Sequence, residues 1–476
     1  MSKKRSGIKR SALPRQLTAS LAGLRAGSAL AVDNAWRKMR HGQRDVEERA
    51  GPKSSKFARK EARRFVRELG QLKGTYVKIG QMLALFGEHF LPLVLTEALH
   101  ELGHQTQPLD WPEVEPLLRQ TLGSYYKELE IETEAIAAAS LAQVHRATVR
   151  ASGEQICLKL QYPGLSEVID ADFDAIIRML LLARWLKSGR DLDDWLQSMR
   201  LHLHHEIDYA REAVLHEQMY TLVKTVSLAD VVLHVPKLYP RYCSTQVLAM
   251  EYIDGATVTA DNIAALPLQR RNALAKAMLE LFFYELYDWG LLQTDPNFGN
   301  YLIRLRPTQS LSKGKDDLVL LDFGSIMDCE ESFLSHLRTA ISAGQEGNRE
   351  ELAQALVGLG CLTAESSEEA RESFSEFCLQ LLEPLRPVQD LPEAYLNDKG
   401  EYCWARSHLM KRAGKQAAAS LANRHFVTPS REFALIARKL TGVFAFISVL
   451  EAEFNAHDIV ASHIRRWREE TRRGKR

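Results

Sequence analysis

The chain carries the run QTDPNFGN at Gln293–Asn300 and the triplet DFG at Asp322–Gly324, and these two segments decide its fold and its chemistry. Asp295 lies five residues before Asn300, and Asp322 follows an apolar run that is typical of a buried strand. In phosphoryl-transfer enzymes with this pattern, the first aspartate takes a proton or orients the nucleophile, while the asparagine and the second aspartate hold Mg²⁺ against the nucleotide phosphates. The pattern therefore predicts a kinase-like nucleotide site, with Asp295 as a catalytic residue and Asn300 and Asp322 as metal ligands.

The residues upstream are arranged like the small lobe of a kinase. An alanine-rich loop joins two predicted strands, and a third strand at 155–160 carries Lys159, which is expected to contact the α- and β-phosphates. Alanines stand where glycines would let backbone amides approach the phosphates, and their Cβ atoms narrow the permitted conformations. We therefore expect ATP or ADP to bind with an altered geometry. The predicted loop residues are Ala137, Ala138, Ala139 and Ser140.

A kinase-like fold also needs an acid on a helix to pair with the strand lysine. The run from His202 to Glu217 is predicted to form one helix, and it contains Glu206 and Glu212. Either carboxylate could pair with Lys159, and the residues leave this choice open. The histidines of the same run lack the i, i+4 spacing of a zinc-binding pair, so we expect no metal site there.

Two predicted strands, at 231–239 and 246–255, end in an interlobe hinge. The backbone of Glu251 to Ile253 is expected to meet the adenine edge, with Met250 as the gate of the nucleotide site. After Gly324 the chain passes almost at once into predicted helices at 333–358, 368–382, 406–422 and 431–454. It contains no Ala-Pro-Glu segment and no long activation loop, so the platform that a protein kinase uses for peptide substrates is missing.

The first 32 residues carry seven basic side chains and no acidic one. Leu13, Leu17, Leu21 and Leu24 would form one apolar stripe on a helix. Such a segment suits an anionic membrane surface, but it also resembles an organelle transit peptide or a disordered basic arm. A charged helix is predicted at 46–68.

Composition excludes several classes of protein. The 476 residues are 45% hydrophobic and 26% charged, with a net charge of +1, so no overall basic field favours nucleic acid. The six cysteines show no metal-ligand spacing and indicate reduced thiols of an intracellular protein. No stretch reaches the roughly 18 apolar residues of a transmembrane helix. We expect a cytoplasmic protein with peripheral membrane contact, or alternatively a mitochondrial matrix protein.

Three short motifs together resemble the AarF/UbiB family of atypical kinase-like proteins. Lys78-Ile79-Gly80-Gln81 matches the family's KxGQ signature, Ala137 to Val144 matches its alanine-rich loop, and Glu206-Ile207-Asp208 matches its ExD motif. The resemblance covers roughly residues 61–327. The segment QTDPN is closer to the mitochondrial and related bacterial branch than to the bacterial version with histidines.

The resemblance implies particular roles for the motif residues. Lys78 and Gln81 would fold over the site and contact Glu206 and Asp208, and Lys78 would join Asp295 and Lys159 among the catalytic residues. Lys159 would pair with Glu212. The family's members look like ATPases or small-molecule kinases that support ubiquinone synthesis, so nucleotide, an isoprenoid lipid or anionic membrane, and quinone-biosynthesis proteins are the implied partners.

Taken together, the sequence predicts an α+β, protein-kinase-like bilobal fold with a helical N-terminal extension and extra C-terminal helices. Its expected parts are a basic arm at 1–45, the extension at 46–125, a small lobe with the hinge at 126–255, a large lobe at 256–455 and a basic tail at 456–476. The leading hypothesis is an ATP-hydrolysing atypical kinase. The alternatives are a true small-molecule or protein kinase, and a non-catalytic scaffold that responds to bound nucleotide.

Overall fold

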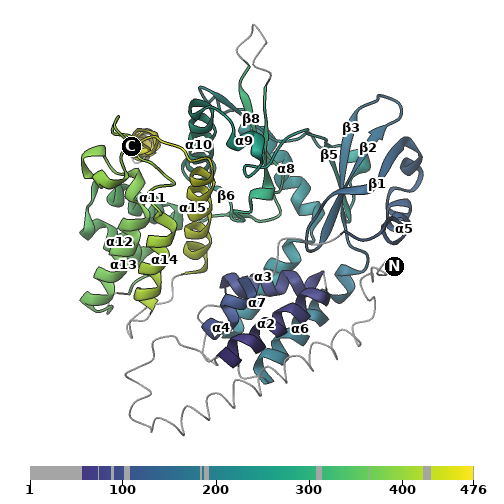
Figure 1. Ribbon diagram of the computed structural model, residues 1–476, viewed down its shortest axis with the longest axis horizontal. Helices are drawn as coiled ribbons and strands as arrows, with labels where there is room; N and C mark the ends of the chain where they lie inside the picture. Colours follow the sequence, from purple (N-terminus) through teal and green to yellow (C-terminus); the bar gives the residue numbers. More distant parts are fainter. Residues whose placement is uncertain are drawn as a thin grey trace. The chain divides into compact units, whose positions relative to one another are not determined.

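The computed structural model describes most of the chain, whose helices and strands are labelled in Figure 1. The chain divides into two compact units. Unit 1 comprises residues up to Ala213 together with Leu238–Tyr252, and unit 2 comprises Val214–Lys237 and everything from Ile253 onward. The described residues are 56–72, 74–86, 91–100, 108–182, 185–186, 192–306, 314–363, 365–421 and 430–474. The predicted basic arm and the start of the predicted extension lie outside them.

Unit 1 contains a four-stranded antiparallel sheet in the order β1-β2-β3-β5. Its strands are β1 (Leu129–Ala138), β2 (Ala142–Val149), β3 (Gln155–Gln161) and β5 (Val247–Glu251). Helix α5 (Trp111–Leu122) and the 3₁₀ segment η1 (Gly123–Glu128) precede the sheet. Val114, Leu118 and Leu122 recur on one face of α5 and belong to the same apolar core as the strands, so α5 covers the sheet.

A separate group of helices builds the rest of unit 1. These helices are α2 (Lys56–Leu72), α3 (Thr75–Phe86), α4 (Leu93–His100), α6 (Leu165–Leu182) and α7 (Leu192–His205). Their shared core includes Phe65, Tyr76 and Trp185, which are almost fully buried. Phe65 and Trp185 meet edge to face with their ring centroids 5.1 Å apart. The KxGQ segment therefore lies on α3, within a packed helical group.

The single helix predicted at 202–217 is wrong, because the chain forms two helices there. Helix α7 ends at His205, and α8 (Tyr209–Val223) begins after a short break. Asp208 causes the restart, since its Oδ1 accepts a hydrogen bond of 3.0 Å from the backbone N–H of Arg211, as a helix N-cap does. The break places Glu206 before the cap and Glu212 on the first turn of α8.

Unit 2 is organised around two small sheets. Strands β4 (Val231–His234), β8 (Asp316–Leu320) and β7 (Tyr301–Arg304) form one sheet in that order, and β6 (Leu291–Gln293) pairs antiparallel with β9 (Ile326–Asp328). Helices α9 (Asp261–Ala264) and α10 (Leu268–Phe283) precede β6. A π-helical turn, η3 (Tyr284–Trp289), follows α10 and ends at Gly290, whose φ of 67° favours glycine.

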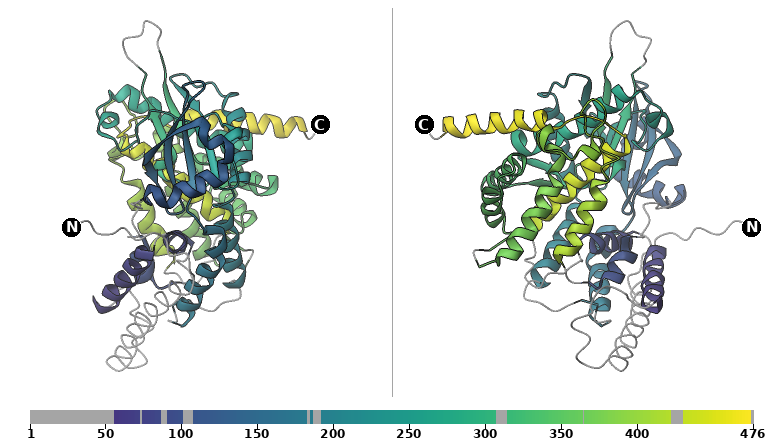
Figure 2. Two further views of the ribbon diagram at one scale, coloured as in Figure 1. Left: turned by 90° about the vertical axis from the view of Figure 1, so that its right-hand side faces the viewer. Right: turned by 60° about the vertical axis from the view of Figure 1, so that its left-hand side comes forward.

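Six further helices complete unit 2, and α16 ends as a rod that extends from the others (Figure 2). They are α11 (Glu331–Glu346), α12 (Arg349–Gly358), α13 (Glu368–Leu381), α14 (Leu409–Leu421), α15 (Arg431–Val449) and α16 (His457–Gly474). The helix predicted at 333–358 is divided in two, because Gly347 adopts a φ of 71° and Asn348 caps α12. The short 3₁₀ turns of unit 2 are η4 (Phe298–Asn300), η5 (Glu383–Leu385), η6 (Val388–Asp390) and η7 (Glu393–Tyr395), while η2 (Pro240–Tyr242) belongs to unit 1. None of the described helices is both long and apolar enough to cross a membrane.

Candidate nucleotide and catalytic site

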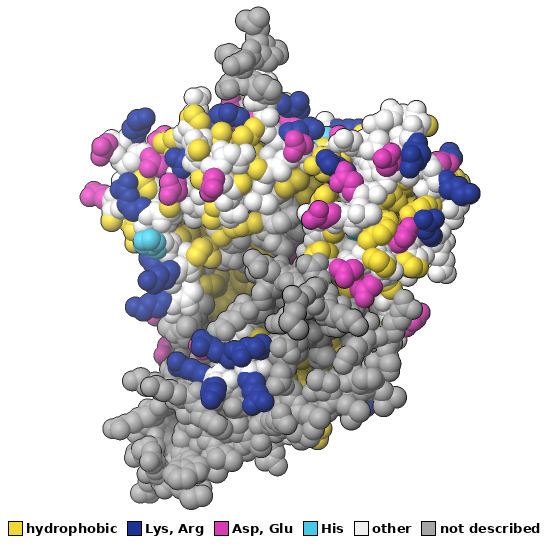
Figure 3. Space-filling model, turned by 45° about the vertical axis from the view of Figure 1, so that its right-hand side comes forward, with side chains coloured by type: hydrophobic (Ala, Val, Ile, Leu, Met, Phe, Trp, Pro, Cys, Tyr) yellow, Lys and Arg dark blue, Asp and Glu magenta, His cyan; other side chains and the backbone are white. Residues whose placement is uncertain are grey.

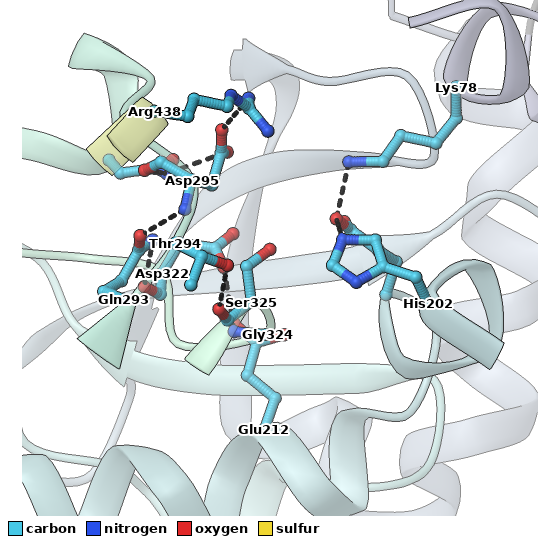
Figure 4. A network of polar contacts seen from close by, with 12 residues as sticks. Lys78, His202, Glu212, Gln293, Thr294, Asp295, Asp322, Gly324, Ser325 and Arg438 are labelled. Atoms are coloured by element: carbon cyan, nitrogen blue, oxygen red, sulfur yellow. Dashed lines mark hydrogen bonds and ion pairs between the residues drawn. The ribbon is translucent and has the colours of Figure 1, made fainter. Parts of the chain in front are cut away.

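In unit 2, a buried glutamine joins the two segments that the sequence singled out (Figure 4). The Oε1 atom of Gln293 accepts a hydrogen bond of 2.6 Å from the backbone N–H of Asp295, and its Nε2 donates to the carbonyl oxygen of Asp322 at 3.3 Å. The backbone N–H and the hydroxyl of Thr294 both donate to the carbonyl oxygen of Ser325, at 3.1 and 2.8 Å. These bonds fix the segment around Asp295 against the segment around Asp322.

The carboxylate of Asp295 is held from two sides. The Nδ2 atom of Asn300 donates to Oδ2 at 3.0 Å, and the Nη2 atom of Arg438 on α15 donates to Oδ1 at 3.1 Å. The side chains of Asp295 and Arg438 are each 27% exposed, so the carboxylate remains accessible to a small molecule. Asp295 therefore has a defined orientation and an open side, as a residue that orients a nucleophile requires.

The backbone brings Asn300 and Asp322 next to each other. The N–H of Leu321 donates to the carbonyl oxygen of Asn300 at 2.9 Å, where β7 and β8 pair. The Asn300 amide presents its nitrogen to Asp295, which leaves Oδ1 as the atom for a cation. Asp322 contributes a carboxylate, and oxygen ligands from one or two side chains together with phosphates are what Mg²⁺ prefers. The residues present therefore fit the predicted metal.

The DFG triplet is anchored through its phenylalanine. Phe323 is fully buried, and its ring meets that of His216 edge to face with centroids 4.8 Å apart. His216 is itself held by a 2.6 Å hydrogen bond between Nε2 and the carbonyl oxygen of Pro236. The backbone N–H of Gly324 donates to Oδ1 of Asp322 at 3.0 Å, which fixes the direction of that carboxylate.

In unit 1, the choice between Glu206 and Glu212 is resolved by distance. Lys159 on β3 lies 2.7 Å from Oε1 of Glu212, which is 2% exposed on the first turn of α8. The lysine ammonium also lies 5.3 Å from the centre of the Tyr209 ring. Lys159 sits in the middle of the sheet, opposite Val144 on β2 and Leu248 on β5. The pair has the arrangement that phosphate-binding lysines have in kinases.

Glu206 pairs instead with the lysine of the KxGQ segment. The Nζ atom of Lys78 lies 2.6 Å from Oε1 of Glu206, and Nε2 of His202 lies 3.9 Å from the same oxygen (Figure 4). Asp208 is exposed and caps α8, as described above. Gln81 is half-buried one turn after Lys78, and within the described part of unit 1 no hydrogen bond joins its side chain to Glu206 or Asp208.

The alanine-rich loop is a tight hairpin rather than a long flap. Ala137 and Ala138 end β1 and pair with Val144 and Gln143, so only Ala139 and Ser140 of the predicted loop residues lie at the turn. The N–H of Ala139 closes the turn by donating to the carbonyl oxygen of Ala142 at 2.7 Å. Tyr162 fastens it, since its hydroxyl donates to the carbonyl oxygen of Ala139 at 3.1 Å.

The predicted hinge residues lie at the end of β5 in unit 1 and at the start of the second part of unit 2. Met250 is buried on β5 opposite Cys157, and Glu251 is half-buried at the end of the same strand. The N–H of Tyr252 continues the pairing by donating to the carbonyl oxygen of Gln155 at 3.1 Å. Ile253 begins the second part of unit 2 and is 6% exposed. Adenine contacts of Met250, Glu251 and Ile253 stay a prediction.

The chain matches the model of the ABC1 atypical kinase-like domain over residues 101–356, more than half of its length. The chain belongs to the ABC1 atypical kinase-like family. The prediction of an α+β, kinase-like fold is thereby confirmed, and so is the resemblance drawn from the three motifs. The sequence of this ABC1 chain also aligns with the sequences of named relatives over most of its length.

Two relatives are atypical kinases. The chain is 27% identical over 444 residues to "Atypical kinase COQ8B, mitochondrial" of Danio rerio, covering 93% of this chain and 67% of the relative. It is 28% identical over 325 residues to "Atypical kinase COQ8, mitochondrial" of Saccharomyces cerevisiae, covering 68% of this chain and 62% of the relative. A solved complex of Rv3197 with erythromycin, from Mycobacterium tuberculosis, has 23% identity and a TM-score of 0.57, and covers 84% of this chain and 94% of that one. That last likeness shows the fold alone.

Sequence reasoning missed two side chains of this ABC1 site. Arg438 binds the Asp295 carboxylate from 143 positions later, on α15. Tyr162 fastens the hairpin turn from just after β3. The only local signal for Arg438 was the pair of adjacent cations, Arg438-Lys439, within the otherwise apolar pattern of α15. For Tyr162 there was no local signal that distinguishes it from a tyrosine of the core.

A buried histidine ties the alanine-rich hairpin to its neighbours. His145 on β2 is 1% exposed, and its Nδ1 lies 2.8 Å from the carbonyl oxygen of Glu132, which can only accept, so Nδ1 carries the proton. Its Nε2 therefore accepts a hydrogen bond of 2.8 Å from the Gln143 amide nitrogen. The amide orientation is set by Leu109, whose N–H donates to Gln143 Oε1 at 2.8 Å. Burial lowers the pKa of His145, although the bond to Glu132 opposes the change.

The neutral His145 makes unit 1 sensitive to acid. Protonating Nε2 would place a donor against the Gln143 amide donor inside the core, at a cost of about 1–2 kcal/mol. Because the pKa is lowered in the fold, this stability is present above about pH 6.5 and is lost as the pH falls below that value. We expect the free energy of unfolding to fall between pH 7 and pH 5 more steeply for the wild type than for His145→Gln. Urea unfolding at each pH measures this, and parallel curves would contradict it.

Proposed function

We propose that the chain binds ATP or ADP with Mg²⁺ and hydrolyses ATP, and that this activity supports isoprenoid quinone biosynthesis at a membrane surface. The observation that carries the proposal is the joining of Asp295, Asn300 and Asp322 into one hydrogen-bonded group through Gln293 and the β7–β8 pairing. Family membership supports nucleotide binding in general.

Each residue has one task in this proposal. Lys159, held by Glu212, would bind the α- and β-phosphates as a point charge. Asp295 would accept a hydrogen bond from the attacking water and orient it. Asn300 and Asp322 would hold Mg²⁺, which neutralises charge on the phosphates when it is bound. Among the described residues there is no cluster of three or more His, Cys, Asp or Glu suited to a metal, so the phosphates would supply the remaining ligands.

Water is favoured over a peptide as the acceptor by the short course of the chain after Gly324. Strand β9 follows at Ile326, and α11 begins at Glu331. This fully described stretch leaves no length for an activation loop that could hold a peptide. A small hydroxylated molecule remains the second candidate, because the Asp295 carboxylate is 27% exposed.

A membrane location is supported by helix α2. Its buried face includes Phe65 and Leu69, while its opposite face is exposed and strongly basic. Figure 3 shows such a gathering of Lys and Arg side chains on the surface. Basic amphipathic helices bind anionic bilayers, at roughly 1 kcal/mol for each cation near the surface. The exposed basic residues of α2 are Arg59, Lys60, Arg63, Arg64 and Arg67.

The link to quinone biosynthesis and to a compartment is supported by the relatives. Two of them carry the name COQ8 and the word mitochondrial, which favours a mitochondrial matrix location over the bacterial cytoplasm. An isoprenoid lipid intermediate or proteins of the quinone pathway are the partners that this role requires.

The test is phosphate release from Mg-ATP by the purified protein, with and without vesicles that contain anionic lipid. We expect phosphate release to rise when anionic vesicles are added. In Asp295→Asn we expect it to fall by roughly 100- to 10,000-fold, because the variant lacks the carboxylate that would orient the water as a base. Asp328→Asn, which removes an exposed carboxylate of β9, is the matched control and should behave as the wild type.

Other outcomes assign the other functions. Release that is unaffected by Asp295→Asn would contradict the role of Asp295. Nucleotide binding without release in any condition would identify a nucleotide-responsive scaffold. Phosphate that appears on an added small molecule or protein in place of free phosphate would identify a true kinase.

A further inference from the structure

Helix α15 touches the catalytic segment 295–301 at three places, all within unit 2. The adjacent residues Arg438 and Lys439 make two of these contacts, and Gly442 makes the third about one turn further along the helix. The segment contains the predicted base Asp295 at its start and the predicted metal ligand Asn300 near its end. A helix that fixes both ends of this segment also fixes the base relative to the metal ligand.

The first contact sets the orientation of the base. Arg438 donates to Oδ1 of Asp295 at 3.1 Å, while Asn300 donates to Oδ2 at 3.0 Å. Each carboxylate oxygen thus has its own donor, and the two donors lie far apart in the sequence. With only one of them, the carboxylate could rotate about its terminal bond, because the torsion of an aspartate carboxylate is broad.

The second contact is a buried network under the end of the segment. The Nζ atom of Lys439 donates to the hydroxyl of Tyr301 at 2.8 Å and lies 3.3 Å from Oε2 of Glu285 on the π-helical turn η3. All three residues are at most 4% exposed. Burial acts to lower the pKa of Lys439, but Glu285 and Tyr301 outweigh it and the net shift is upward. Removing one partner of such a pair is costly, so the network holds Tyr301, and with it Asn300, in place.

The third contact brings α15 at Gly442 against the ring of Pro296. A Cβ atom added at Gly442 would lie 2.0 Å from Cβ of Pro296 and 3.3 Å from its Cα. Side-chain carbons do not approach so closely, so glycine is what lets α15 lie directly against the residue after Asp295. The middle of α15 is therefore packed closely against the catalytic segment.

We propose that α15 is the positioning element of the catalytic segment, and that Arg438 is a positioning residue that holds Asp295 in the orientation that directs water at the phosphate. This inference rests on the proposed function, in which Asp295 orients the nucleophile. Arg438 acts through Asp295 and needs no contact with the nucleotide.

The test compares Arg438→Met, Arg438→Lys and a control, Arg349→Met. Arg349 forms an exposed ion pair of 2.7 Å with Glu376, far along the chain from the catalytic segment. We expect Arg438→Met to lower kcat for phosphate release about 10- to 100-fold, because small misplacements of a catalytic group have effects of that size. KM, nucleotide affinity and the thermal midpoint should stay near wild type, and Arg438→Lys should recover part of kcat.

Adding Arg438→Met to Asp295→Asn should lower kcat no further, because the arginine acts only through that carboxylate. Hydrogen exchange supplies a readout that needs no turnover. Exchange of backbone amides in 295–301 should rise in Arg438→Met and stay unchanged in Arg349→Met.

The outcomes separate the two proposals. If Asp295→Asn is as active as the wild type, the proposed function fails, and the exchange result alone decides the positioning role. If Asp295→Asn is inactive but Arg438→Met keeps full kcat, the inference fails while the proposed function stands. A rise in kcat would mean that Arg438 restrains Asp295 and would overturn the inference. Unchanged hydrogen exchange of 295–301 in Arg438→Met would also overturn the inference. The same holds for a fall in kcat that accompanies a fall in the thermal midpoint and is not recovered in Arg438→Lys.

Discussion

Replacing Asp322 with Asn is expected to abolish Mg²⁺-dependent nucleotide binding while the fold stays intact. The carboxylate Oδ1 accepts a hydrogen bond from the N–H of Gly324, and the amide oxygen of asparagine can accept the same bond. The neighbouring Phe323 remains buried against His216. The substitution therefore removes one negative charge and little else. We expect phosphate release to fall roughly 100-fold or more, equivalent to about 3 kcal/mol, because the metal would lose a charged ligand.

The measurement is nucleotide affinity with and without Mg²⁺. For the wild type, Mg²⁺ should strengthen the binding of ATP, and for Asp322→Asn the affinity should no longer depend on Mg²⁺. Asp328→Asn is again the matched control, since Asp328 is an exposed aspartate close by in the sequence. Equal Mg²⁺ dependence in the wild type and Asp322→Asn would remove Asp322 from the metal site.

Breaking the pair between Lys159 and Glu212 is expected to have a large effect on stability. In Lys159→Met the Glu212 carboxylate, which is 2% exposed, would remain in the interior without its 2.7 Å partner. Removing one partner of a buried ion pair costs about 3–5 kcal/mol, and the 16% exposure of Lys159 reduces this to about 2–3 kcal/mol. Denaturant unfolding followed by circular dichroism measures the loss.

The double variant Lys159→Met/Glu212→Leu separates stability from function. Replacing both charges by apolar groups is often nearly neutral, so most of the stability should return. Nucleotide affinity should not return, because no cation is left to bind the phosphates. Recovery of nucleotide binding in the double variant would show that Lys159 has no part in it. If the loss of stability in the double variant equals the sum of the losses in the two single variants, the interaction between Lys159 and Glu212 contributes nothing to stability.

The local parts of the site could be predicted from the sequence. Asp295 follows β6, Asn300 precedes β7 and Asp322 follows β8, so all three lie next to strand ends within one short stretch of sequence. Helix α5 is likewise marked locally, by an apolar repeat and by Pro112 in its first turn. The kinase-like fold follows from the same motifs and was confirmed by the family match.

What could not be predicted depends on partners far away in the sequence. Arg438 reaches Asp295 across 143 positions, and helical periodicity says only that α15 has a buried face. The division of the helix at 202–217 depends on whether Asp208 caps or continues it, and an aspartate can do either. The partner of Lys159 depends on that division, because the division decides which acid lies on the first turn of α8.

The dependence of Asp295 on α15 also concerns the order in which the chain is made. The ribosome produces Asp295, Asn300 and Asp322 well before it reaches Arg438. A growing chain that has completed β6 to β9 therefore contains the predicted base and the predicted metal ligands before Arg438, Lys439 and Gly442 have been made. The contacts that orient Asp295 arise only after α15 has been synthesised and packed, so under the proposed function a nascent chain would not turn over ATP before then.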